Sequence, residues 1–379
     1  MENIERVNVG ITHGDINGIG YEIIIKMLME PRINDFCTPI VYGSPKVAAY
    51  HRKVIGVNNF SFNTIREAAE ANPKRANIIN CNDDSLRVEL GKSTEFAGQS
   101  ALEALEIATN DLKEGKIDVL VTAPINKKNI QTEQFSFPGH TEYLMKKFET
   151  DKALMLMVYN NLRIGVVTGH VPLSKVPELI TEENILEKLR VMHQSLIADF
   201  AVQKPKIAVL GLNPHAGDDG VIGNEELTII IPAIEKAQKE NIMALGPYPA
   251  DGFFGSDNYS KFDAILAMYH DQGLIAFKSL VPMTGEGVNY TAGLPFVRTS
   301  PAHGTAYEIT GKNEASPNSI RAALYLACDI FKNRAYHKDL IDNALVPSEV
   351  DLAAHFKHNF VDEAIPIEDF EDETPVALL

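Results

Sequence analysis

Short hydrophobic runs rich in valine and isoleucine recur along the chain, and each run ends in small or turn-forming residues. Stretches with helical spacing of apolar positions fill many of the gaps between these runs. This alternation predicts an α/β fold with a mostly parallel sheet. The predicted strands cover residues 7–12, 40–42, 119–122, 164–168, 207–212 and 264–268.

Three helical patterns are clear enough to predict where helices begin or end. The first covers residues 97–114, where apolar positions repeat every three to four residues until Gly115 stops the helix. Thr181 is predicted to begin a second helix, since two glutamates follow it in the first turn. Pro232 should start or kink a third helix.

Length and charge limit the classes of protein to which this sequence can belong. At 379 residues and 45% hydrophobic, the chain favours two domains over one core. Its 35 basic and 51 acidic residues give a net charge of −16, which disfavours nucleic acid and membrane surfaces as partners. No spanning segment or signal peptide is expected, so a soluble cytoplasmic protein is predicted.

Two further features of composition narrow the possible chemistry. Cys37, Cys81 and Cys328 form no CxxC pair, which fits a reducing compartment and predicts no thiolate metal cluster. Residues 361–375 hold seven acidic residues and no basic one, and they belong to a predicted acidic C-terminal extension over residues 346–379. A solvated tail is the simplest interpretation of that extension.

Histidines end three of the six predicted strands: His170, His215 and His270. Ligands of open α/β sheets gather beyond the carboxyl ends of the strands, so three imidazoles could meet there. Such a set suits a divalent metal such as zinc. The alternative is that each histidine simply bonds to the backbone of its own loop.

Several loops are candidates for binding an anion. The glycine-rich turn at residues 14–20 could cradle a phosphate, but it is not the GxGxxG fingerprint, and tight packing explains its glycines equally well. His140 and Thr141 can donate hydrogen bonds just before a helix, unless Thr141 is only the helix cap. Further along lie Lys278, Asn289 and Arg298; the two cations suit a buried phosphate or carboxylate, with surface ion pairing as the alternative.

One string near the C-terminus resembles the adenosine-binding loop of the isocitrate and isopropylmalate dehydrogenases. It spans residues 303–312 and continues to an alanine, a proline and an asparagine. By this resemblance the cofactor-binding residues are His303, Gly304, Thr305, Ala306, Glu308 and Gly311. Those enzymes bind a nicotinamide dinucleotide without a Rossmann fingerprint, which fits its absence here.

Taken together, the motifs resemble the 4-hydroxythreonine-4-phosphate dehydrogenase family of pyridoxal phosphate biosynthesis. The resemblance covers residues 9–326 through eight ordered strings: ITHGDINGIGYE, VTAPINK, FPGHTEYL, VTGHVPLSKV, GLNPHAGDDGVIGNEE, GPYPADGFF, AMYHDQGLIAFK and VNYTAGLPFVRTSPAHGTA. Eight matches in order are far more specific than one.

The resemblance implies a fold and an activity. Two α/β/α domains of the isocitrate dehydrogenase type are expected, with the active site in the cleft between them. Residues 1–130 plus 285–345 would bind the cofactor, and residues 131–284 would carry the metal, the substrate site and the dimer contacts. The expected reaction is NAD- or NADP-dependent oxidation of 4-hydroxy-L-threonine 4-phosphate. The resulting 2-amino-3-oxo-4-phosphooxybutanoate then decarboxylates to 3-amino-2-oxopropyl phosphate.

The resemblance also implies roles for individual residues. One zinc, magnesium or cobalt ion per subunit would be held by His170, His215 and His270, with ligands drawn from both subunits of an obligate homodimer. The expected substrate contacts are His140, Thr141, Lys278, Asn289 and Arg298. Candidates for the general base are Asp251, Asp271 and Lys278, although the aspartates are favoured as groups that orient a metal-bound histidine.

The sequence departs from the family at its first motif, where His13, Ile16, Asn17 and Tyr21 replace three prolines and an alanine. These changes are expected to alter the rigidity of the turn.

Alternative functions also stay open: oxidation of 4-phospho-threonate or 4-phospho-erythronate, a three-histidine metal hydrolase, or a noncatalytic phosphometabolite-binding protein.

Overall fold

The computed structural model describes residues 6–81, 87–131, 137, 139–282 and 285–345, so the predicted acidic extension lies outside the described residues. The chain divides into two units, Met1–His337 and Lys338–Leu379, and the sheet and cavity described below belong to the first. Among the described residues, no helix has both the length and the apolar character needed to cross a membrane.

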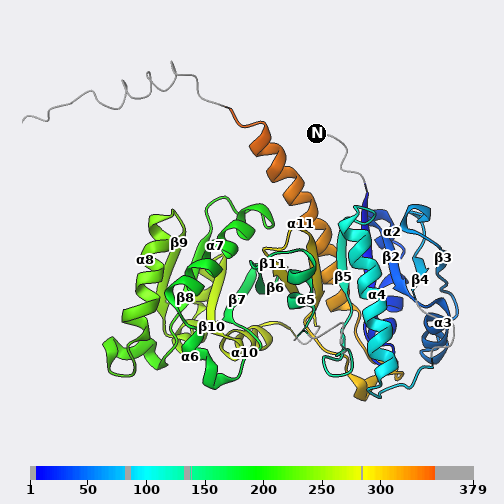
Figure 1. The fold of residues 1–379 in the computed structure, drawn as a ribbon, viewed down its shortest axis with the longest axis horizontal. Coiled ribbons are helices and arrows are strands. Elements are labelled where there is room, and N and C mark those ends of the chain that lie inside the picture. The colour runs from blue at the N-terminus through cyan, green and yellow to red at the C-terminus, as the bar shows by residue number, and fades with distance from the viewer. Residues whose placement is uncertain (1–5, 82–86, 132–136, 138, 283–284, 346–379) are drawn as a thin grey trace, which may run out of the picture. The chain divides into compact units, whose positions relative to one another are not determined.

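Twelve strands of the described chain join in one sheet, in the order β3-β4-β2-β1-β5-β12-β11-β6-β7-β10-β8-β9 (Figure 1). In sequence the strands are β1 (Val7–Thr12), β2 (Cys37–Gly43), β3 (Asn63–Ile65), β4 (Asn77–Asn80), β5 (Val119–Thr122), β6 (Leu154–Tyr159), β7 (Leu162–Thr168), β8 (Lys206–Leu210), β9 (Met243–Tyr248), β10 (Ala264–Tyr269), β11 (Val288–Ala292) and β12 (Val297–Pro301).

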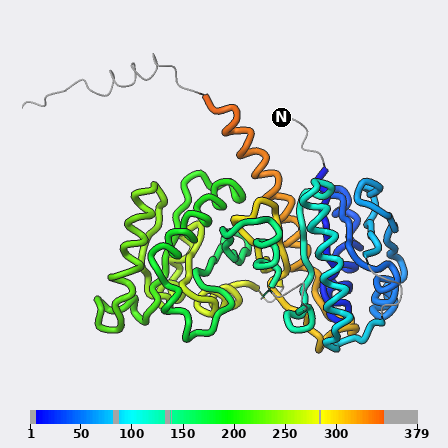
Figure 2. Tube along the Cα trace, viewed as in Figure 1, coloured from blue at the N-terminus to red at the C-terminus, as the bar shows by residue number. Residues whose placement is uncertain are grey.

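The helices are α1 (Gly20–Leu28), α2 (Ile33–Phe36), α3 (Pro45–Val54), α4 (Glu95–Lys113), α5 (His140–Lys147), α6 (Val176–Leu179), α7 (Glu182–Ala198), α8 (Ile231–Lys239), α9 (Ala250–Gly255), α10 (His270–Leu280) and α11 (Asn318–Asp342). The trace in Figure 2 follows the chain through these elements. Helix α4 packs against β1, β2 and β5, whereas α10 packs against β7 and β10.

The sheet is parallel except around two central strands. From β3 to β12 every neighbouring pair is parallel, and so is every pair from β7 to β9. Between these parallel sets, β11 runs antiparallel to β12 and β6, and β6 antiparallel to β7. The prediction of an α/β fold with a mostly parallel sheet is confirmed, while the domain boundaries near residues 130 and 285 stay a prediction.

Local signals placed most of the predicted elements correctly. All six predicted strands are present, although β8 ends at Leu210 and not at Leu212. The Thr181 hydroxyl accepts a hydrogen bond from the Asn184 backbone N–H at 3.2 Å, so it caps α7 as predicted. Gly115 follows α4 with a φ of 72°, and Pro232 lies in the first turn of α8. The predicted helix end at Gly115 and the predicted helix start at Pro232 are therefore confirmed.

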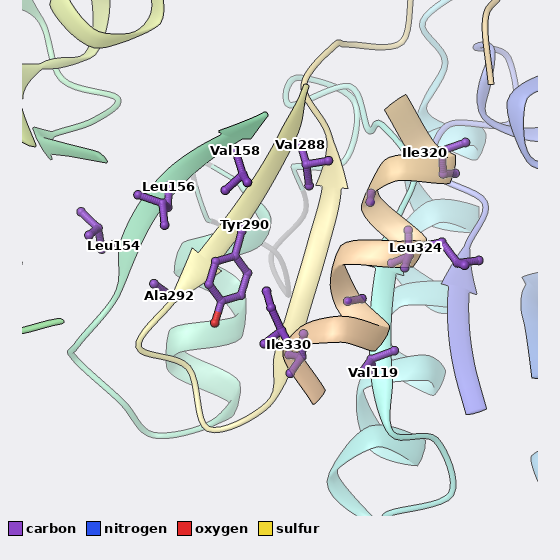
Figure 3. Packing of buried hydrophobic residues seen from close by; sticks show 14 of the residues in the cluster. Val119, Leu154, Leu156, Val158, Val288, Tyr290, Ala292, Ile320, Leu324 and Ile330 are labelled. Carbon is purple, nitrogen blue, oxygen red and sulfur yellow. The ribbon is translucent and has the colours of Figure 1, made fainter. Parts of the chain in front are cut away.

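Alternation along the central strands separates the two faces of the sheet. On β6 and β11, every second side chain is apolar and buried: Leu154, Leu156, Val158, Val288, Tyr290 and Ala292. Figure 3 shows these residues in the same cluster as Ile320, Leu324 and Ile330 of α11. Because side chains alternate between faces, the intervening residues point to the opposite face, where Asn289 of β11 lies in the same cavity lining as Met155 and Met157 of β6.

A buried carboxylate ties α7, β11 and α11 together. Asp199 is 2% exposed, and its Oδ2 accepts hydrogen bonds from the Tyr290 hydroxyl and the Ser195 hydroxyl, both at 2.5 Å. Its Oδ1 accepts from Arg334 Nε at 2.6 Å. Arg334 Nη2 also donates to the Tyr290 hydroxyl at 2.9 Å. This network fixes the apolar face of the central strands against the helices that cover it.

We predict that Asp199→Asn lowers the free energy of unfolding by about 2–4 kcal/mol, because it leaves the Arg334 charge unpaired and largely buried. Urea denaturation measures the change. The matched control is Glu240→Gln, which breaks the exposed Arg190–Glu240 pair and should cost less than about 1 kcal/mol. Equal losses in the two variants would contradict this account of the network.

Candidate active site

A cavity of about 260 Å³ lies on the other face of the central strands. Thr122 on β5, Arg298 and Ser300 on β12, and Asn289 on β11 all line it. The register explains why these side chains meet, since Asn289 lies opposite Ser300 and β12 pairs with β5 on its other edge. The alternation that buries Tyr290 on one face therefore presents its neighbours to the cavity on the other.

Arg298 is the buried cation of this cavity. It is 3% exposed, and its guanidinium donates to the Thr122 hydroxyl at 2.6 and 3.1 Å and to the Thr291 hydroxyl at 3.2 Å. No carboxylate of the described residues forms an ion pair with it. Burial lowers the pKa of Arg298 to about 10, which still leaves it charged at neutral pH. A buried charge held only by hydroxyls is well suited to bind an anionic ligand.

His140 and Thr141 lie at the start of α5 and line the same cavity. The helix begins at His140 with Gly139 as its N-cap, and no side chain of the described residues caps it, so the interpretation of Thr141 as a helix cap is wrong. Burial, with the nearby charges of Arg298 and Lys127, holds the pKa of His140 well below 6.5. Its imidazole is therefore neutral. His140 Nε2 is buried and has no hydrogen-bonding partner among the described residues.

Two of the three predicted metal ligands lie together. The rings of His170 and His270 are 5.7 Å apart between centroids, and both line the cavity. His270 Nδ1 lies 2.7 Å from Asp271 Oδ1, an arrangement that fixes the ring and leaves Nε2 available. His215 is exposed on another segment and does not line the cavity. The described part of one chain contains no group of three His, Cys, Asp or Glu side chains placed to hold a metal.

Two charged residues of the cavity were not predicted. Lys127 Nζ lies 3.0 Å from His170 Nε2, and Glu142 Oε1 lies 3.8 Å from His170 Nδ1. The neighbouring His170, with help from the charge of Lys127, lowers the pKa of the Glu142 carboxyl. The signal was present, since Lys127 closes the motif after the 119–122 strand and Glu142 directly follows His140 and Thr141.

The remaining predicted residues are divided between the cavity and the surface. Asn289 lines the cavity, and its Oδ1 is buried without a partner among the described residues. Lys278 and Asp251 are exposed and do not line the cavity of their own chain. Within one chain, the structure therefore brings Asn289 to the candidate site and leaves these two outside it.

The predicted cofactor loop packs against the glycine-rich turn. His303 and Gly304 line the cavity, whereas Thr305, Ala306, Glu308 and Gly311 do not. The Thr305 carbonyl accepts from the Ile19 backbone N–H at 3.1 Å, and the Tyr307 hydroxyl donates to Asp15 Oδ2 at 2.7 Å. Two segments that are almost 300 residues apart in sequence are thus held side by side.

Close packing accounts for the first glycine of that turn. A Cβ on Gly14 would lie 2.3 Å from the Pro124 carbonyl oxygen, and the residue has a φ of 70°. Asp15 Oδ1 accepts from the Asn17 N–H at 2.8 Å, and Oδ2 accepts from Asn129 Nδ2 at 2.7 Å. The turn therefore uses its own polar groups to join the loops around it, which favours the packing interpretation over a phosphate cradle.

Stacked aromatic rings occupy two of the three positions where the family has prolines, those of His13 and Tyr21. The rings of His13 and Tyr21 stack at 5.1 Å, and those of Tyr21 and His51 at 5.3 Å. Tyr21 also accepts a hydrogen bond from the Ser44 N–H at 2.8 Å. All three side chains are fully buried. The stacked rings therefore order this segment in the absence of the proline rings that restrict it in the family.

Comparison with known proteins gives three concordant matches and one that differs in name. A family model described as pyridoxal phosphate biosynthetic protein PdxA matches residues 35–327. A 4-hydroxythreonine-4-phosphate dehydrogenase of Bacteroides thetaiotaomicron is 53% identical over 334 residues, which is 88% of this chain and 91% of the relative. A crystal structure of a 4-hydroxythreonine-4-phosphate dehydrogenase from Klebsiella pneumoniae superposes with a TM-score of 0.76 and 32% identity, covering 87% of this chain and 99% of that one. A relative from Oceanobacillus iheyensis, 38% identical over 85% of this chain and 97% of its own, is named as a D-threonate 4-phosphate dehydrogenase.

The buried stack predicts a pH dependence of stability. Burial lowers the pKa of His51 to about 4, and its Nε2 contacts the Ile16 carbonyl at 2.7 Å. The unfolded chain binds this proton near pH 6.5, so His51 should remove up to about 3 kcal/mol of stability as pH falls from 6.5 to 4. His51→Gln should flatten that part of the curve in urea denaturation. The control, His337→Gln, should keep the wild-type slope; a slope unchanged in His51→Gln would refute the assignment.

Arg298→Met should abolish the stabilisation of this protein by inorganic phosphate, because the cavity loses its buried cation. The measurement is the phosphate-dependent shift in Tm, taken for each variant relative to its own value without phosphate. Arg163→Met is the matched control, since Arg163 is also buried but lies over the Phe200 ring, outside the cavity. It should retain the wild-type shift. A full shift in Arg298→Met would show that anions bind elsewhere.

Proposed function

This chain belongs to the family of pyridoxal phosphate biosynthetic proteins described as PdxA, and from that premise we propose that it oxidises 4-hydroxy-L-threonine 4-phosphate with NAD or NADP. The product, 2-amino-3-oxo-4-phosphooxybutanoate, is a β-keto acid that loses carbon dioxide to give 3-amino-2-oxopropyl phosphate. Relatives that match most of this chain carry the corresponding dehydrogenase name, which supports an oxidoreductase over a hydrolase or a binding protein.

The buried Arg298 in the cavity is the observation that carries the proposal. Its guanidinium has donors to spare after its bonds to Thr122 and Thr291, and it has no carboxylate partner among the described residues. A phosphorylated substrate would supply the missing anion. His140, which is neutral, and the Thr141 hydroxyl would donate further hydrogen bonds to the phosphate or the carboxylate. These contacts would fix which carbon faces the nicotinamide.

We propose that His170 and His270 form part of a divalent-metal site. The donor set fits, because two imidazoles share one edge of the cavity and Asp271 orients the second of them. His215 does not line the cavity of its own chain, so a homodimer would have to complete the set. Exposed Leu173 lies beside both histidines in a second hollow, and such an apolar surface suits a subunit contact. The chemistry that a divalent metal supplies at such a site is a lower pKa for the substrate alcohol and stabilisation of negative charge.

The nicotinamide cofactor is proposed to lie along the loop at residues 303–311. His303 and Gly304 open onto the cavity, and a Cβ on Gly304 would meet nothing within 4 Å, so the backbone there is accessible to a ligand. Thr305, Ala306, Glu308 and Gly311 would bind parts of the dinucleotide that lie further from the reacting carbon. The general base remains among Lys278, Asp251 and Asp271, and the first two would need to act in the cavity of a second subunit.

Oxidation of 4-phospho-D-threonate is a second candidate function, because the Oceanobacillus relative is named for that activity. The two substrates share the phosphate, the carboxylate and the alcohol. They differ at C2, where one carries an ammonium group and the other a hydroxyl group.

The purified protein should reduce NAD or NADP with 4-hydroxy-L-threonine 4-phosphate, and a chelator should abolish the activity until a divalent metal is restored. The absorbance of the reduced nicotinamide measures turnover. His170→Ala and His270→Ala should each lower kcat/KM by more than about 100-fold, since each removes a proposed metal ligand. His193→Ala is the control and should keep wild-type activity, because His193 lies in a separate hollow with Arg190 and Glu240 and does not line the cavity. Turnover that is insensitive to the chelator would contradict the metal proposal, and no turnover of either substrate would contradict the function.

A further inference from the structure

The loop proposed to bind the nicotinamide cofactor has little regular structure of its own. Between the end of β12 and the start of α11 lies one short 3₁₀ turn, Tyr307–Ile309. Ala306, directly before that turn, has a φ of 44°, a left-handed conformation that a residue with a Cβ rarely adopts. Such a conformation persists only where the surrounding structure holds it. The shape of this loop therefore depends on its contacts with other segments.

The hydroxyl of Tyr307 joins the loop to two other segments. It donates to Asp15 Oδ2 at 2.7 Å and accepts from Asn126 Nδ2 at 3.0 Å. Burial, together with the hydrogen bond to Asp15, raises the pKa of Tyr307 to about 12, so the hydroxyl keeps its proton and stays a donor at neutral pH. Tyr307 thus links the proposed cofactor loop to the glycine-rich turn and to the loop after β5.

Asp15 is itself held in place on both sides. It is 1% exposed, and its Oδ1 accepts from the Asn17 backbone N–H at 2.8 Å. Its Oδ2 accepts from Asn129 Nδ2 at 2.7 Å in addition to the Tyr307 hydroxyl. Hydrogen bonds to an ionised carboxylate are stronger than those between neutral groups. The Asp15–Tyr307 bond therefore joins the loop to a fixed point of the fold.

The far end of the loop is anchored separately, on helix α1. Glu22 Oε1 accepts from the Ala315 backbone N–H at 2.9 Å, and Lys26 Nζ donates to the Ala315 carbonyl at 2.8 Å. These bonds do not involve Tyr307. Loss of the Tyr307 hydroxyl should therefore loosen residues 303–309 and leave the rest of the chain folded.

We propose that Tyr307 is a positioning residue whose hydrogen bond to Asp15 orders residues 303–309 in advance for the nicotinamide dinucleotide. The inference rests on the proposed function, since it takes this loop as the cofactor site. A loop that is already ordered loses less conformational entropy when its ligand binds, so the bond raises affinity for the dinucleotide without touching it. Affinity for the phosphorylated acid should change little, because its proposed contacts lie on β11, β12 and α5.

The experiment compares the wild type with Tyr307→Phe, which removes only the hydroxyl. Titration with NADH and NADPH, followed by nicotinamide fluorescence, should show about 10-fold weaker binding to the variant, as expected for the loss of one hydrogen bond to a charged group. In the turnover assay, KM for the oxidised cofactor should rise by a similar factor. The kcat and the KM for the phosphorylated acid should stay near their wild-type values.

Tyr42→Phe is the matched control. The Tyr42 hydroxyl also donates to a carboxylate, Asp111 Oδ2 at 2.8 Å, but Tyr42 lies on β2 and does not line the cavity. This variant loses a bond of the same kind and should bind the dinucleotide as the wild type does. A loss of dinucleotide affinity in Tyr42→Phe equal to that in Tyr307→Phe would show a general loss of stability and would overturn the inference.

Hydrogen exchange tests the order of the loop without any ligand. The backbone amides of residues 303–309 should exchange about 10-fold faster in Tyr307→Phe than in the wild type, and at the wild-type rate in Tyr42→Phe. Unchanged exchange rates in Tyr307→Phe, or equal losses of affinity for the dinucleotide and for the phosphorylated acid, would overturn the inference.

The two proposals fail in different ways. If the wild type binds neither dinucleotide, the proposed function fails and the inference fails with it. If the wild type binds a dinucleotide and Tyr307→Phe binds it equally well, only the inference fails.

Discussion

The burial of the Arg298 guanidinium on the face of a central strand is the constraint on which the rest of the site depends. A buried charge is tolerated only if hydrogen bonds or an opposite charge compensate it, and here Thr122 and Thr291 provide hydroxyl oxygens from the two neighbouring strands. Those threonines must occupy the same face as Arg298, which fixes the register of β5, β12 and β11. The opposite face of the same strands is mostly apolar, and α11 packs against it, with the Thr299 hydroxyl donating to the Ala323 carbonyl of that helix at 2.8 Å.

The direction of the central strands decides where the chemistry lies. In a sheet that is parallel throughout, ligands gather at the carboxyl ends of the strands. Because β11 runs antiparallel to β12, Asn289 near the start of β11 lies opposite Ser300 near the end of β12, and both line the cavity beside loops that follow β5 and β7. The site is therefore built from one face of the sheet and from loops at the ends of strands. Asn289 belongs to strand β11, whereas His170 belongs to the loop after β7, and both line the cavity.

The first motif shows how a turn can be ordered by residues other than the prolines of the family. Prolines restrict a chain through their rings, whereas here three buried aromatic rings stack and Tyr21 accepts a backbone hydrogen bond. The glycines are retained because Gly14 and Gly20 approach the backbone too closely for a Cβ. Asp15 then joins this turn to Asn129 and Tyr307, so the loop proposed to bind the cofactor is positioned by a segment from the other end of the chain.

The sequence by itself determined part of the secondary structure, because apolar periodicity and capping residues act over a few neighbouring positions: six of the twelve strands in the described sheet, the cap at Thr181 and the stop at Gly115 follow from it. Its motifs also identified the family and eight of the residues that line the cavity: His140, Thr141, His170, His270, Asn289, Arg298, His303 and Gly304. The polar strands β11 and β12 were not predicted as strands, because their pattern is explained only by what packs on each face. Only the tertiary structure decided that Lys127 and Glu142 join the site and that Lys278 and His215 lie outside the cavity of their own chain. It also decided that Arg298 is buried with no carboxylate partner among the described residues. These are distances and desolvation between residues far apart in sequence, and no local pattern encodes them.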